Sequence, residues 1–170
     1  MNPNMTIRDE QASDVGAIHR ITEAAFRHEE HSSRTEQFIV DALRRNGQLT
    51  ISLVAEQDGA VVAHVAISPV AISGGATGWF GLGPVSVDPD HQGRGIGSAL
   101  ILAALDALKR LGGTGCVVLG NPGYYGRFGF RACPGLVLPG VPPAYFQALS
   151  FADDMPEGTV RYGDAFDATE

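Results

Sequence analysis

The chain has 170 residues and a hydrophobic fraction of 44%, which fits one domain, residues 1–170, with a sizeable core that needs no disulfide or metal to stabilise it. Its formal net charge of −7 argues against a nucleic-acid-binding protein, because such a protein needs a basic surface. The sequence shows neither a signal peptide nor 18 consecutive apolar residues, and Cys116 and Cys133 lack the spacing of metal ligands. We therefore expect a cytoplasmic protein with no metal and no membrane or nucleic-acid partner.

The N-terminal part of the chain predicts one strand and two helices. A short strand is expected over 5–8, and Asp14 is expected to cap a first helix, because its side chain can accept hydrogen bonds from free N–H groups there. Apolar residues then recur every three or four positions, which gives this helix one apolar face. A second helix starts at Ser33 or Thr35 and ends before Gly47.

Three strands follow without an intervening helix. They are expected over 49–56, 61–72 and 79–87, where β-branched and other apolar residues dominate. The turn 57–60 joins the first two strands and contains Asp-Gly, a pair that favours a tight hairpin. The sequence therefore predicts three consecutive antiparallel strands.

The stretch 83–97, GPVSVDPDHQGRGIG, joins the third of these strands to a helix through a glycine-rich turn. Pro89 ends the strand, because proline lacks the N–H that a ladder needs. From Ile96 onward apolar residues recur at helical spacing until Gly112 and Gly113 end the helix. N–H groups in the first turn of a helix have no partner inside it, and the helix dipole is positive at that end. The stretch therefore predicts a site that binds an anion such as phosphate.

Several interpretations of this glycine-rich turn compete. A Walker-type loop needs a lysine after its last glycine, but Ser98 follows Gly97. A dinucleotide fingerprint needs Gly-x-Gly-x-x-Gly, whereas these glycines stand at 93, 95 and 97. A plain tight turn has no need of three alternating glycines.

The pattern Gln-x-x-Gly-x-Gly over 92–97 resembles the pyrophosphate loop of the GNAT superfamily of acyl-CoA-dependent N-acetyltransferases. The segment 82–89 before it resembles the fourth strand of that family. The segment 121–130, NPGYYGRFGF, resembles the second motif, in which Tyr125 precedes Gly-Phe by four residues. The resemblance is firm over 82–130 and looser, but compatible, over the rest of the chain.

The order of the expected elements predicts an α/β fold with a mixed, mostly antiparallel central sheet and helices on both faces. The connection from the strand before Asp88 through a helix to the strand over 115–119 implies a parallel crossover, whereas the earlier strands pair antiparallel. This order matches the topology of the family that the chain resembles. The tail from Cys133 onward is rich in proline, with a last strand over 158–162 and a frayed end over 164–170.

The resemblance implies that acetyl-CoA is the acyl-donor cosubstrate. In the family, the fourth strand hydrogen-bonds the pantetheine arm and polarises the thioester carbonyl, so this strand is expected to splay from its neighbour at Leu119-Gly120. The strand residues that this maps to are Val85, Ser86 and Val87. The loop residues that would hold the pyrophosphate are Gln92, Gly93, Arg94, Gly95, Ile96, Gly97 and Ser98.

Two residues of the second motif carry the catalytic expectations. Tyr125 is the expected general acid, since a phenol has a pKa near 10 and can protonate a departing thiolate. The alternative for Tyr125 is packing alone. Asn121 resembles an asparagine that binds near the pantetheine or the acceptor, and its alternative is a turn residue before proline. Both alternatives stay open at this point.

The general base and the acceptor are not identified by the sequence. The base candidates are His28, Glu29, Glu30, His31, Glu36 and His64. The acceptor is expected to be a small-molecule or peptide amine, to which the acetyl group is transferred directly, and a homodimer is compatible with the resemblance. The lack of an obvious base leaves one rival, a non-enzymatic sensor that binds acyl-CoA without turning it over.

Overall fold

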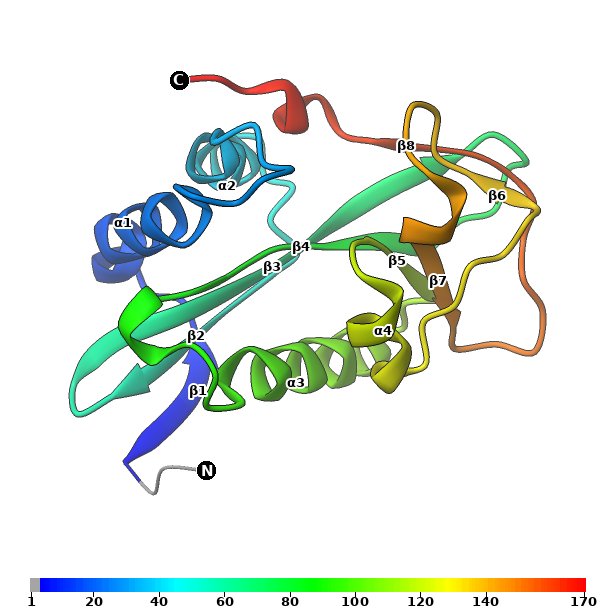
Figure 1. The fold of residues 1–170 in the computed structure, drawn as a ribbon. Coiled ribbons are helices and arrows are strands. Elements are labelled where there is room, and N and C mark those ends of the chain that lie inside the picture. The colour runs from blue at the N-terminus through cyan, green and yellow to red at the C-terminus, as the bar shows by residue number, and fades with distance from the viewer. Residues whose placement is uncertain (1–3) are drawn as a thin grey trace.

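The computed structural model describes residues 4–170 as a twisted central sheet with helices on both faces (Figure 1). The strands are β1 (Met5–Asp9), β2 (Ile51–Gln57), β3 (Ala60–Ile72), β4 (Trp79–Val87), β5 (Gly115–Leu119), β6 (Leu136–Val137), β7 (Phe146–Ser150) and β8 (Gly158–Tyr162). The helices are α1 (Val15–Phe26), α2 (Glu36–Arg45), α3 (Ile96–Arg110) and α4 (Pro122–Tyr125). The main path runs β1-β2-β3-β4-β5-β7, and only β4 and β5 pair parallel along it. The predicted fold class is confirmed.

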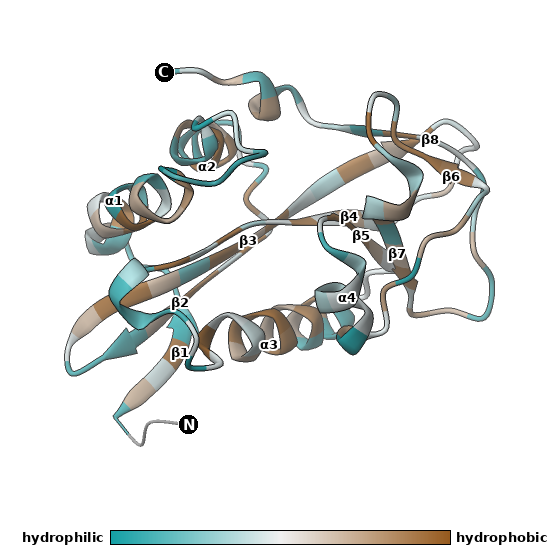
Figure 2. Cartoon of the chain, viewed as in Figure 1, coloured by the Kyte–Doolittle hydropathy of each residue, from teal (hydrophilic) through white to brown (hydrophobic). Residues whose placement is uncertain are grey.

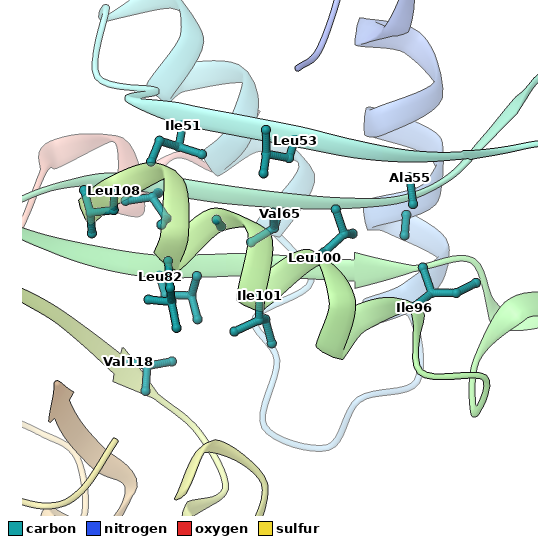
Figure 3. Close-up of a cluster of buried hydrophobic side chains, with 14 of the residues drawn as sticks. Ile51, Leu53, Ala55, Val65, Leu82, Ile96, Leu100, Ile101, Leu108 and Val118 are labelled. Atoms are coloured by element: carbon teal, nitrogen blue, oxygen red, sulfur yellow. The ribbon is translucent and has the colours of Figure 1, made fainter. Parts of the chain in front are cut away.

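One face of the sheet is covered by α3, and Figure 1 shows α1 and α2 on the other face. Leu100, Ile101 and Leu108 of α3 are fully buried against the sheet. Their partners include Leu53 and Val65 on the middle strands, as Figure 3 shows. Figure 2 shows hydrophobic residues along the central strands and along α3. This continuous apolar cluster holds the helix that starts at the glycine-rich turn.

The first helix does not begin as the sequence predicted. Asp14 stands just before α1, but its carboxylate makes no capping bond to the helix. It accepts instead from the Arg8 guanidinium at 2.7 Å and from the Gln11 N–H at 2.6 Å. A charge-assisted hydrogen bond to a guanidinium is stronger than one to a neutral backbone donor, so the carboxylate ties β1 to the start of α1.

The C-terminal segment also differs from the prediction. The expected strand over 158–162 is present as β8, but the residues after it are packed rather than frayed. Ala165 is only 2% exposed and lies in a small cluster with Ile39 and Leu43 of α2. The apolar face of α2 thus holds the end of the chain against the body of the protein.

A bulge and an opening distinguish β4 from the other strands. Val65 and Ile67 of β3 pair with Val85 and Leu82, so β4 carries one extra residue between these pairs. On its other edge, β4 pairs with β5 only as far as Gly81 opposite Val117. Both strands continue beyond this pair, and they diverge. The expected splay is present, and it begins before the end of β5.

Candidate active site

The glycine-rich turn uses left-handed backbone at two glycines. Gly93 has φ 77° and Gly95 has φ 81°, conformations that side chains other than glycine rarely adopt. A Cβ at either position would meet no atom within 4 Å, so backbone conformation and not crowding requires glycine in the free protein. Gly95 is the residue before α3, so the first N–H groups of that helix, from Ile96 to Ser98, face the turn without helical partners.

Two long side chains of the turn behave differently. Gln92 is exposed, and its Nε2 donates to the Val87 carbonyl at 3.1 Å, which ties the turn back to the end of β4. Arg94 is also exposed, and it makes no ion pair within residues 4–170. Gln92 therefore shapes the turn, whereas Arg94 is available to an anionic ligand.

The open edge of β4 presents backbone groups from alternate residues. The Asp88 N–H donates to the Val62 carbonyl across the β3–β4 pair at 2.8 Å. Because bonding alternates along an antiparallel pair, Ser86 also directs its backbone toward β3. Val85 and Val87 then direct theirs toward the opening, in agreement with the bond that Val87 accepts from the turn.

The side chain of Ser86 also points away from the opening. Ser86 is 1% exposed, and its hydroxyl donates to Thr22 Oγ1 of α1 at 3.3 Å. Of the three strand residues that the resemblance singled out, two therefore present their backbone to the opening, and Ser86 connects the strand to α1.

Tyr125 lies where β5 ends, at the edge of the opening. Its ring packs on Gly120, where no side chain would fit, and meets the Phe130 ring edge-on at 6.1 Å between centroids. Burial, followed by the neighbouring Tyr124, raises the pKa of Tyr125 to about 12. The phenol is therefore protonated at neutral pH, the form that a proton donor needs.

Asn121 fills the position before α4. Its Oδ1 accepts from the Gly123 N–H at 2.8 Å, so the turn role of this residue is confirmed. The residue is exposed, and its role toward a ligand stays a prediction.

Tyr124 stands next to Tyr125 in the second motif, and the sequence pattern gives it no role. Its hydroxyl is 3.0 Å from Ser98 Oγ in the first turn of α3, and it would lie 3.7 Å from a Cβ at Gly97. The Arg127 guanidinium stacks on its ring at 4.7 Å. The helical turn of α4 makes this long-range contact, and no local pattern in the sequence indicates it.

The base candidates fall into two environments. The four loop candidates, 28–31, are exposed, and Glu36 accepts from Ser32 Oγ at 2.7 Å. His64 is fully buried, with its Nε2 2.7 Å from Ser52 Oγ. Burial lowers the pKa of His64 to about 4, so the imidazole is neutral.

Ser52 connects this histidine to an ion pair at the edge of the sheet. Its hydroxyl donates to Glu10, which accepts two further hydrogen bonds from Arg44 of α2 at 2.8 Å each. The four residues form one chain of contacts from the interior of β3 to the surface. The His64 Nδ1, in contrast, has no hydrogen-bond partner in the described part of the chain.

Within its described part, the chain offers neither a metal site nor a membrane-spanning helix. Within residues 4–170, no three His, Cys, Asp or Glu side chains gather so that they could hold a metal ion. No helix in the same range has the length and apolar character needed to cross a membrane.

Comparison with known proteins assigns this architecture to the acetyltransferases. The family model described as "Acetyltransferase (GNAT) domain" matches residues 6–133. The chain belongs to the GNAT family of acetyltransferases, which are enzymes. It is 36% identical to the Escherichia coli K12 protein named "Uncharacterized N-acetyltransferase YhbS", over 95% of this chain and 98% of that protein.

Two solved structures share the fold closely. A GNAT family acetyltransferase from Brucella melitensis, in complex with acetyl-CoA, is 50% identical with a TM-score of 0.86, over 97% of this chain and 99% of the other. The Escherichia coli YhbS structure, in complex with CoA, is 33% identical with a TM-score of 0.85, over 100% and 97% of the two chains.

Proposed function

We propose that this protein binds acetyl-CoA along the open edge of β4 and transfers the acetyl group directly to a primary amine, within a ternary complex. The observation that carries the proposal is the divergence of β4 from β5 beside the left-handed turn at the start of α3. The acetyl-CoA and CoA held by the two related structures support the same cosubstrate here.

The cosubstrate is expected to occupy the place of a missing strand. Its pyrophosphate meets the unpartnered N–H groups at the start of α3, where the helix dipole favours negative charge. Arg94 adds a cation at the same turn. The amide groups of the pantetheine arm then pair with the backbone of Val85 and Val87, so the arm takes the hydrogen bonds that a neighbouring strand would make.

The transfer itself needs one nucleophile and one proton donor. The lone pair of a neutral amine attacks the thioester carbonyl carbon, a C–N bond forms, and the oxyanion is stabilised by backbone donors of β4. When the C–S bond breaks, the sulfur takes the proton of the Tyr125 hydroxyl. The nitrogen releases its proton to water, and the tyrosinate recovers one from solvent. The raised pKa of Tyr125 keeps its proton in place until this step.

The cosubstrate site is tested by calorimetric titration of the protein with acetyl-CoA and with CoA. We expect micromolar binding by the wild type and its loss in Gly95→Trp, because the indole fills the turn and its backbone disfavours φ 81°. Gly47→Trp is the matched control, since Gly47 also has positive φ and open space but lies after α2. Failure of the wild type to bind either ligand contradicts the proposal.

The proton donor is tested by Tyr125→Phe in an assay with an amine panel and acetyl-CoA. We expect kcat to fall about 100-fold or more, the usual contribution of a general acid, with acetyl-CoA binding nearly unchanged. Tyr145→Phe, at an exposed tyrosine, serves as the control. Full turnover by Tyr125→Phe would show that another group, or water, protonates the thiolate.

A further inference from the structure

The opening between β4 and β5 has a closed end, and an aromatic ring from the C-terminal strand covers it. The last paired residues of the two strands are Gly81 and Val117. A Cβ at Gly81 would lie 2.6 Å from Cε2 and 3.2 Å from Cζ of Tyr162. The ring therefore rests directly on the backbone at the point where the strands part, and only glycine permits this approach.

Two contacts fix the Tyr162 ring in this place. Tyr162 is the last residue of β8 and pairs with Val70 of β3, next to the strand that it covers. The Phe166 ring meets it edge-on, with 4.8 Å between centroids and 68° between the planes. Because a strand pairing and an aromatic contact both hold it, the ring is a preorganised wall.

The Tyr162 phenol lies close enough to the proposed proton donor, Tyr125, to interact with it electrostatically. Burial raises the pKa of Tyr162, and the nearby Cys116 thiol and Tyr125 phenol raise it further. Cys116 is fully buried on β5, next to the last paired residue, and Tyr125 comes from the other end of that strand. Tyr162 therefore lies at the closed end of the opening, and Tyr125 lies at the other end of β5.

The direction of the cosubstrate places its acyl end there. This step rests on the proposed function. The pyrophosphate lies at the turn after Val87, and the arm runs back along β4 past Val85. Val87 and Gly81 are six residues apart, which is about 20 Å of strand. The far end of a ligand that starts at the turn and follows this edge therefore meets the closed end.

We propose that Tyr162 is a specificity-determining residue that closes the acyl end of the donor site and restricts the donor to short acyl groups. The ring limits length by occupying the space that the third and fourth carbons of a longer acyl chain need. Its hydroxyl is not required for this role.

The test measures binding alone, so it needs no knowledge of the acceptor. Acetyl-CoA, propionyl-CoA and butyryl-CoA are titrated calorimetrically into wild type, Tyr162→Ala and Tyr162→Phe. We expect the wild type to prefer acetyl-CoA over butyryl-CoA, and Tyr162→Ala to reduce that preference about tenfold or more, the usual discrimination for added methylenes in a closed pocket. Tyr162→Phe keeps the ring and is expected to keep the preference. Tyr145→Ala removes an exposed tyrosine and is the matched control.

The outcomes separate this inference from the proposed function. If the wild type binds no acyl-CoA, the proposed function fails and the inference falls with it. If the wild type binds acetyl-CoA but Tyr162→Ala leaves the preference unchanged, or the wild type has no preference, only the inference is overturned. Loss of the preference in Tyr162→Phe overturns the steric role in favour of the hydroxyl. Should Tyr162→Ala fail to fold, Tyr162→Leu reports the same ratio with a smaller void.

Discussion

The two faces of the sheet are built on different principles. The face under α3 is one continuous apolar cluster that extends from Ile51 on β2 to Val118 on β5. The opposite face is divided into three smaller clusters. Between these clusters lie polar side chains that are less than 10% exposed, namely Thr22, Gln37, Ser52, His64, Ser68 and Ser86. The face under α3 buries mainly apolar side chains, which stabilise the fold. The opposite face also buries polar side chains, some of them next to β4, and burying a polar group costs stability.

Burying polar groups on this face lowers stability most where a polar atom finds no hydrogen-bond partner. Gln37 Oε1, His64 Nδ1 and Ser68 Oγ are buried there without a hydrogen-bond partner among residues 4–170. A buried polar atom without a partner costs about 1–3 kcal/mol, so such atoms are rare in structural cores. Ser68 pairs with Gly81 at the closed end of the opening, and His64 pairs with Ser86 on the open strand. The unpartnered atoms of His64 and Ser68 therefore lie on β3, the strand that pairs with β4 beside the opening, and not under α3.

Stability should respond most strongly to a cavity on the α3 face. Leu100→Ala removes a fully buried side chain at the centre of that cluster, and the free energy of unfolding should fall by about 2–5 kcal/mol. Leu102→Ala, at a residue of the same helix that is 58% exposed, should change it by about 0.5 kcal/mol or less. Urea denaturation followed by circular dichroism measures both. Equal losses in the two variants would contradict the role of the buried cluster under α3 in stability.

Because His64 is buried on the polar face, the free energy of unfolding should depend on pH. The pKa of His64 is about 4 in the folded protein, below the value near 6.5 of an unfolded chain. The stability due to neutral His64 is therefore present above pH 6.5 and is lost as the pH falls from there toward 4. Between pH 7 and pH 5 this loss is about 2 kcal/mol. His64→Gln should lose correspondingly less over the same interval.

The groups around His64 set the window and the control for that experiment. Glu10, Ser52 and Arg44 form its polar surroundings. Burial alone would raise the pKa of Glu10, but hydrogen bonds from Arg44 and Ser52 hold it below its usual range, so Glu10 contributes its own loss only at lower pH. His31→Gln, in the exposed loop after α1, should keep the wild-type slope. Identical slopes for wild type and His64→Gln would mean that the pKa of His64 is not lowered in the folded protein.

Local sequence patterns predicted most of the fold and the cosubstrate loop. The turn at 57–60 needs left-handed backbone at Asp58 and Gly59, and the Asp-Gly pair predicts such a turn. The strand, the alternating glycines and the apolar spacing of α3 are likewise properties of contiguous residues. Such elements can be predicted from neighbouring residues alone, without knowing how the rest of the chain folds.

Contacts between distant segments were not predictable in the same way. Nothing near Tyr124 indicates that its hydroxyl meets Ser98, and nothing near Tyr162 indicates that its ring covers Gly81. The packing of Ala165 on α2 was missed for the same reason, because the segment 164–170 has no regular apolar spacing. Such contacts depend on which strands become neighbours, and this is decided by the whole sheet.

The position of β8 also bears on how the protein matures during synthesis. A chain leaves the ribosome N-terminus first, so β1 to β5 and the helices between them can associate before β8 appears. The ring of Tyr162 reaches Gly81 only after β8 has emerged. A chain that lacks β8 therefore has the glycine-rich turn but no aromatic ring over Gly81. If Tyr162 selects the donor as proposed, the enzyme acquires that selectivity only after β8 has joined the sheet.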